Sequence, residues 1–124
     1  MPIEHNYLRT RVRVSNIVKN YELLRQNGGQ VVAVVKADAY GHGLLETATA
    51  LAAAGCETFA IGSVAEGAAL RDAGCRGAIV SLLGPVLPED DVLVIEKGLI
   101  PFIHDFEQLA RLAERCRAMG RTAR

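Results

Sequence analysis

A run of five apolar residues that ends at a lysine constrains the fold of this chain more than any other stretch. Residues 31–35 are too few and too β-branched for a helix, and they fit a strand buried on both faces. Glycine and polar residues follow at once, so Lys36 lies where the strand ends and a loop through Gly43 begins. In sheets built from repeated βα units, active sites lie at the carboxyl ends of the strands. Lys36 is therefore the first candidate functional residue, although many such lysines are simply the first solvated residue past a core.

Helix and strand patterns alternate along the rest of the chain. Ser15 is a candidate N-cap for a first helix that ends at Gly28, and the alternation of residues 11–14 allows a short strand before it. Further helices are expected at 44–54, 63–73, 89–97 and 105–119, and strands at 31–35, 58–62, 78–83 and 99–103. One helix followed by four strand–helix pairs predicts a parallel sheet with right-handed crossovers.

Local signals support several of these boundaries. Ser63 and Glu66 have the spacing of a capping box, and Asp105 with Gln108 resembles a second one. Pro101 falls inside the last expected strand, and proline is tolerated there mainly at a sheet edge or a bulge. The last strand is therefore the least regular of the four expected strands.

Composition excludes several classes of partner. The 124 residues suffice for one domain, half of them are hydrophobic, and the net charge is zero, so neither nucleic acid nor an anionic membrane is an expected partner. Three cysteines without a Cys-x-x-Cys pair argue against a disulfide framework or a zinc site and favour the reducing cytoplasm. Residues 1–13 lack the apolar core of a secretory signal, and no apolar segment is long enough to span a bilayer. No metal site is expected, and the isolated His5 and His104 are expected at the surface.

The string Val-Val-Lys-Ala-Asp-Ala-Tyr-Gly-His-Gly, residues 34–43, closely resembles the cofactor lysine motif of alanine racemases, which depend on pyridoxal 5′-phosphate. The resemblance continues through Gly55 and through residues 59–66, 70–74 and 79–84, and it covers most of the chain from about Ser15 onward. It implies an α/β fold of parallel βα repeats, roughly the first half of a TIM (β/α)8 barrel. Such a barrel needs about 250 residues and eight strands, so residues 1–124 would be a partial N-terminal barrel domain, without the second barrel half and the β-rich domain of the family.

The same resemblance implies roles for two residues of the motif. Lys36 matches the lysine that binds pyridoxal phosphate covalently and moves the α-proton on one face of the amino acid. Tyr40 matches the tyrosine that hydrogen-bonds the cofactor phosphate, although a half-buried packing role is a common alternative for a tyrosine. Asp38 and His42 belong to the motif without an assigned chemical role, and Leu82 or Leu83 could line the cofactor.

The resemblance also implies an activity and what this chain lacks for it. The family interconverts L-alanine and D-alanine and so supplies D-alanine for peptidoglycan, and a homodimer is expected for the full-length protein. The opposite-face base, the arginine at the pyridine nitrogen and most phosphate donors lie further along the family's chains than Arg124. The isolated 124-residue chain is therefore expected to be inactive alone.

Three other functions stay open at this stage. One is a racemase for another small amino acid, because the residues that select the substrate are absent. Another is a noncatalytic pyridoxal phosphate-binding protein, which would need Lys36 and Tyr40 but no opposite base. The third is a small doubly wound binding domain of flavodoxin or receiver size. Against this last function, the chain has no acidic cluster at its expected strand ends and no Gly-x-Gly-x-x-Gly.

Overall fold

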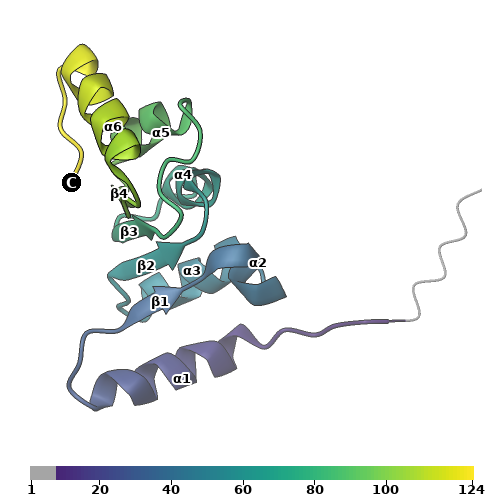
Figure 1. The fold of residues 1–124 in the computed structure, drawn as a ribbon. Coiled ribbons are helices and arrows are strands. Elements are labelled where there is room, and N and C mark those ends of the chain that lie inside the picture. Colours follow the sequence, from purple (N-terminus) through teal and green to yellow (C-terminus); the bar gives the residue numbers. More distant parts are fainter. Residues whose placement is uncertain (1–7) are drawn as a thin grey trace, which may run out of the picture.

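A four-stranded parallel sheet forms the centre of the structure, a computed structural model that describes residues 8–124 (Figure 1). The strands lie in the order β1-β2-β3-β4, and each pairs in parallel with the next. Their bounds are β1 (Val32–Val34), β2 (Thr58–Ile61), β3 (Ala78–Ser81) and β4 (Ile100–Pro101). Neighbours in the sheet are thus consecutive strands in the chain, which confirms the predicted parallel βα repeat.

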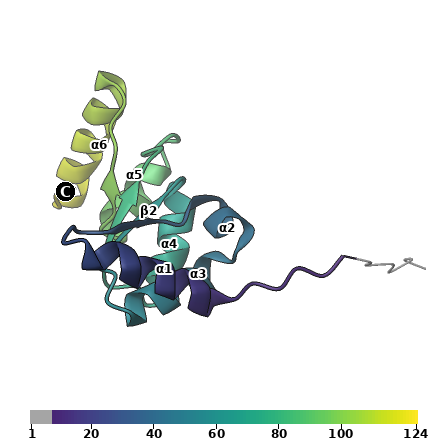
Figure 2. The same ribbon diagram turned by 90° about the horizontal axis from the view of Figure 1, so that it is seen from below.

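Helices connect consecutive strands, and one further helix lies before the first strand and one after the last. The elements follow one another in space from α1 at one end to α6 at the other (Figure 1), and residues 8–13 extend away from the body of the molecule (Figure 2). The helices are α1 (Val14–Gln26), α2 (Lys36–Gly41), α3 (Leu44–Ala53), α4 (Val64–Asp72), α5 (Asp90–Glu96) and α6 (Phe106–Met119). Within the described residues, none of these helices is long and apolar enough to cross a membrane.

The two faces of the sheet differ in burial. Phe59, Ile61 and Ile79 alternate onto the face that packs against the helices, and all three are fully buried in the main core. On the other face, Val32 and Val34 are 49% and 43% exposed. The strand register places one apolar row across this open face: Val34, Ala60, Val80 and Ile100. A sheet that is apolar on both faces but covered on one is what part of a barrel presents.

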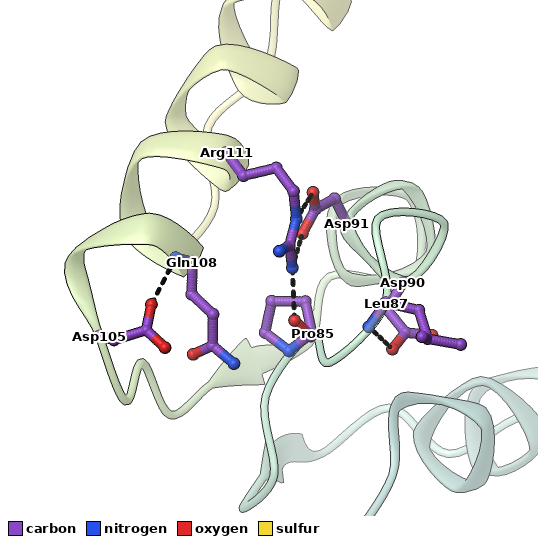
Figure 3. A network of polar contacts seen from close by, with 7 residues as sticks. All are labelled: Pro85, Leu87, Asp90, Asp91, Asp105, Gln108 and Arg111. Carbon is purple, nitrogen blue, oxygen red and sulfur yellow. Dashed lines mark hydrogen bonds and ion pairs between the residues drawn. The ribbon is translucent and has the colours of Figure 1, made fainter.

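Two capping predictions are confirmed and one is wrong. Ser63 Oγ accepts the Glu66 N–H at 3.3 Å, which completes the predicted capping box of α4 together with the Glu66 carboxylate. Asp105 accepts the Gln108 N–H at 2.7 Å at the start of α6 (Figure 3). Ser15, however, is not an N-cap, because α1 already begins at Val14 and Ser15 lies inside its first turn.

The strand predictions need correction at both ends of the chain. Residues 11–13 form no strand, because no other segment of the described chain pairs with them. The last strand covers only Ile100–Pro101 instead of residues 99–103. It lies at the sheet edge, one of the two places where a proline is tolerated, and within the described sheet it pairs on one side only, with β3. A proline there removes a donor that would have no partner strand within the described sheet.

Candidate functional site

Lys36 lies just past the carboxyl end of β1, where it is the first residue of α2. It is partly buried. A Cβ atom built on Gly62, at the end of β2, would be 3.6 Å from Lys36 Cβ. Lys36 and Gly62 are therefore neighbours across two strand ends, and the missing side chain at position 62 leaves space beside the lysine.

Backbone hydrogen bonds continue past the ends of the strands and bring the residues after β3 beside Gly62. The N–H of Val35 donates to Ala60 at 2.8 Å, and the N–H of Leu83 donates to Gly62 at 3.1 Å. Leu82 is partly buried and Leu83 is 54% exposed, and both follow β3 at the same end of the sheet as Gly62.

The segment after Lys36 is a left-handed turn rather than the loop expected from the sequence. Residues 37–40 of α2 have φ between 52° and 55° and ψ between 37° and 54°. None of these four residues is glycine, and left-handed backbone costs each about 1–2 kcal/mol. Such a conformation persists only where surrounding contacts hold it, and such strain clusters at functional sites.

Side chains of the motif hold this turn from within. Asp38 Oδ1 accepts the N–H of Leu44 at 2.7 Å, at the start of α3, and so joins the turn to the following helix. His42 Nδ1 lies 2.8 Å from the carbonyl oxygen of Ala39, which it reaches as a donor. Asp38 and His42 thus have structural roles that their spacing did not reveal.

Tyr40 is mostly exposed at the end of the left-handed turn. Its side chain is 61% exposed, so the alternative of a half-buried packing tyrosine is wrong. Tyr40 lines an apolar hollow of about 330 Å³ between α1 and β1, together with Val34 and His42, and Lys36 is not among the residues of that hollow. Lys36 and Tyr40 thus belong to the same short segment, α2, but do not line the same hollow.

The Lys36 ammonium has no ion-pair partner among the described residues. The ion pairs there are Lys97–Asp72 and Arg111–Asp91, so no carboxylate neutralises the Lys36 ammonium. The same residues contain no group of three metal-ligating side chains, and the three cysteines are free thiols. His104 is exposed, as expected, and its Nε2 lies 2.9 Å from the Leu82 carbonyl oxygen, while His5 lies outside the described residues.

Comparison with known proteins identifies the family. The family model for the N-terminal domain of alanine racemase matches residues 12–124. The chain belongs to the alanine racemase family. Among curated relatives, the alanine racemase of Nitratidesulfovibrio vulgaris strain Miyazaki F is 42% identical over 115 residues, which are 93% of this chain and 31% of the relative. This alanine racemase-family chain thus spans about a third of the length of the curated relatives it matches.

Solved alanine racemase structures share the fold. The enzyme of Clostridium difficile 630 superposes with a TM-score of 0.77 at 27% identity, over 89% of this chain and 30% of that one. The enzyme of Bartonella henselae, with covalently bound pyridoxal phosphate, gives 0.77 at 29% identity, over 89% and 31%. These matches confirm that the βα repeat is that of the N-terminal barrel domain of alanine racemases, as predicted for roughly the first half of a TIM barrel.

Proposed function

We propose that this chain is the cofactor-lysine part of a pyridoxal phosphate-dependent alanine racemase. The observation that carries the proposal is Lys36, an amine without an ion-pair partner in the described chain, at the carboxyl end of a barrel strand in a family whose members are alanine racemases. Residues 1–124 would form a partial N-terminal barrel domain, with the rest of the barrel and a β-rich domain outside this chain. A homodimer in the cytoplasm and a supply of D-alanine to peptidoglycan belong to the same proposal.

Two residues of the chain support pyridoxal phosphate as the group that it would hold. The amine of Lys36 would bind the aldehyde, and Leu82 or Leu83 would line the cofactor beyond the end of β3. The exposed hydroxyl of Tyr40 is available as a donor to the phosphate. When bound, the cofactor withdraws electrons from the α-carbon of an amino acid and so acidifies its C–H bond. Lys36, once released, would take the α-proton from one face of alanine and return it.

Reductive labelling tests the role of Lys36. The purified chain is treated with pyridoxal phosphate and borohydride, which fixes the cofactor on the lysine that bound it, and peptides are mapped. The expected result is a label on Lys36 in preference to Lys19 and Lys97, the two other lysines. Lys19→Arg and Lys97→Arg serve as matched controls that should keep the label, whereas Lys36→Arg should lose it. Equal labelling of all three lysines would contradict the proposal.

Hydrogen exchange at alanine separates the racemase from a noncatalytic carrier. With cofactor added, the chain should exchange the α-hydrogen of one alanine enantiomer slowly with solvent, because Lys36 serves one face only. Rapid interconversion of both enantiomers is not expected, because the opposite-face base lies outside this chain. A labelled Lys36 without any exchange would favour the carrier. Comparing alanine with serine in the same assay addresses a racemase for another small amino acid.

A further inference from the structure

Glu66 joins two parts of the site that are far apart in the sequence. It lies in the first turn of α4, where its Oε2 accepts the N–H groups of Gly62 and Ser63 at 2.8 and 3.0 Å. These two bonds belong to the N-terminus of the helix. Its other oxygen, Oε1, accepts the N–H of Ala37 at 2.7 Å, across 29 residues of sequence. A carboxylate that serves only as a helix cap does not need this third bond.

The third bond fixes the backbone on the far side of Lys36. On the near side, the Val35 N–H donates to Ala60 of β2 at 2.8 Å. On the far side, the Ala37 N–H donates to Glu66, so Lys36 stands between two backbone hydrogen bonds that anchor it to β2 and to α4. Ala37 is also the first residue of the left-handed run, where φ changes from −120° at Val35 to 52°. Without the Glu66 carboxylate as acceptor, the Ala37 N–H would lose its hydrogen bond at the point where the backbone becomes left-handed.

Because Gly62 has no side chain, the Glu66 carboxylate can lie close to the backbone at the end of β2 and reach the Ala37 N–H. A Cβ on Gly62 would lie 3.1 Å from Glu66 Oε2 and 3.6 Å from Lys36 Cβ. The carboxylate therefore passes beside the backbone of the β2 end, in the space next to the lysine. The Glu66 side chain thus hydrogen-bonds the end of β2, the start of α4 and the left-handed turn.

We propose that Glu66 is the positioning residue for Lys36, and that it acts through the Ala37 N–H rather than on the reacting atoms. A charge-assisted hydrogen bond to a carboxylate is among the stronger single contacts in a protein. It sets where the Lys36 side chain starts and in which direction it leaves the strand. The importance of that direction rests on the proposed function, whereas the bond to Ala37 stands independently of it.

Amide hydrogen exchange tests the bond directly. Glutamine has one acceptor oxygen and an NH₂ group that can only donate, so Glu66→Gln cannot accept on both sides at once. In the purified chain, in the assembly it adopts, Glu66→Gln should raise the exchange rate of the Ala37 amide about tenfold or more. Ser63→Ala is the matched control, because it removes the reciprocal half of the capping box without touching Ala37. Its Ala37 amide should exchange as in the wild type.

Reductive labelling with pyridoxal phosphate and borohydride gives the second readout. The share of label on Lys36, relative to Lys19 and Lys97 in the same molecule, should fall severalfold in Glu66→Gln and stay unchanged in Ser63→Ala. A freely exchanging Ala37 amide with an unchanged label share in Glu66→Gln would overturn the positioning role and leave the proposed function intact. A wild-type chain that does not label Lys36 would instead contradict the proposed function, while the Ala37 amide would still decide the bond.

A shorter carboxylate covers the case in which Glu66→Gln does not fold. Glu66→Asp keeps the charge and both oxygens near the helix N-terminus but shortens the side chain by one methylene. It should therefore keep α4 capped and lose the reach to Ala37. A folded Glu66→Asp chain with fast exchange at Ala37 supports the proposal, and one with wild-type exchange at Ala37 overturns it.

Discussion

Arg111 of α6 donates its Nε–H to Oδ2 of Asp91 of α5 at 2.8 Å, and the Asp91 side chain has no exposed surface (Figure 3). The same guanidinium also donates to the carbonyl oxygen of Pro85, in the segment that follows β3. One side chain thus joins α6, α5 and the β3–α5 connection. Because a buried carboxylate without a partner is costly, this pair is an anchor of the C-terminal half of the described chain.

We expect Asp91→Asn to destabilise the chain strongly. Breaking a buried pair costs about 3–5 kcal/mol, and the lower end applies because the Arg111 side chain is 26% exposed. Asp72→Asn is the matched control, because Asp72 pairs with Lys97 at the surface with 64% of its side chain exposed. That change should cost less than about 1 kcal/mol. Urea unfolding of both variants measures the difference, and equal costs would contradict the anchor.

The same pair determines a pH response on the alkaline side. The hydrogen bond that Arg111 donates to the Asp91 carboxylate raises the pKa of Arg111 above its ordinary value; burial acts in the opposite direction, and charge attraction by Asp91 adds to the increase. A raised folded-state pKa gives stability that is complete below the unfolded value and is lost only as pH rises through the folded value. The difference in unfolding free energy between the wild type and Arg111→Met should therefore be constant from neutral to mildly alkaline pH. A decline within that range would mean that another group controls the pair.

Gly84 should tolerate no side chain. Its φ is 65°, and a Cβ there would overlap the carbonyl oxygen of Phe102, next to β4. Gly84→Ala should cost about 3 kcal/mol or more, because strain and overlap add. Gly74 is the control, since its φ is 91° but a Cβ there meets nothing within 4 Å. Gly74→Ala should cost about 1–2 kcal/mol from backbone strain alone, and similar costs at both positions in thermal unfolding would count against the close approach.

Tyr40→Phe should separate cofactor binding from stability. The Tyr40 side chain is 61% exposed, so removing its hydroxyl should change the unfolding free energy by less than about 0.5 kcal/mol. If the hydroxyl donates to the cofactor phosphate, retention of pyridoxal phosphate should weaken about tenfold. Tyr21→Phe is the control, because Tyr21 is 6% exposed and lies in the core, where it should leave cofactor retention unchanged. Equilibrium dialysis compares the three proteins, and equal retention by Tyr40→Phe and the wild type would remove Tyr40 from the site.

The open face of the sheet should make the chain associate. Val32 and Val34 are exposed on an edge strand, and unpaired strand edges with apolar side chains pair with other chains. We expect a self-associated form, a complex with the rest of the barrel, or a compact loose state, rather than a tightly packed monomer. Val34→Lys should weaken association measured by sedimentation, whereas Leu23→Lys on α1 should not. A dilute monomer with strongly protected amides in 31–35 would contradict this expectation.

Local signals predicted those parts of the fold that depend on neighbours in the sequence. The capping box of Ser63 and Glu66 and the Asp105 cap were predicted because each contact spans three residues. The β-branched run before Lys36 predicted a strand buried on both faces. The parallel strand is confirmed, but the burial is wrong, because Val32 and Val34 lie exposed on the open face of the described sheet. The cap assigned to Ser15 was wrong because the N-cap of α1 is Arg13, two residues earlier, and a cap depends on where the last non-helical residue falls.

Contacts between distant residues were beyond the reach of sequence patterns. The left-handed turn of residues 37–40 is unfavourable by itself, so nothing in their spacing predicted it. It is held by Glu66 and by the Asp38 contact with α3, and the first of these crosses 29 residues. Asp91 lies in the first turn of α5, and its pairing with Arg111 depends on how α5 packs against α6.

The sequence by itself determined the order of strands and helices, the parallel sheet and Lys36 at a strand end, because short-range periodicity and β-branching act within each element. Only the tertiary structure decided which face of the sheet stays open, which residue of the next strand end lies beside Lys36, and how the backbone leaves the strand. Those features depend on strand register and on single hydrogen bonds such as Ala37 to Glu66, which exist only once α4 packs beside β1 and β2. Contacts between residues far apart in the sequence stabilise these features, so the pattern of neighbouring residues along the chain does not predict them.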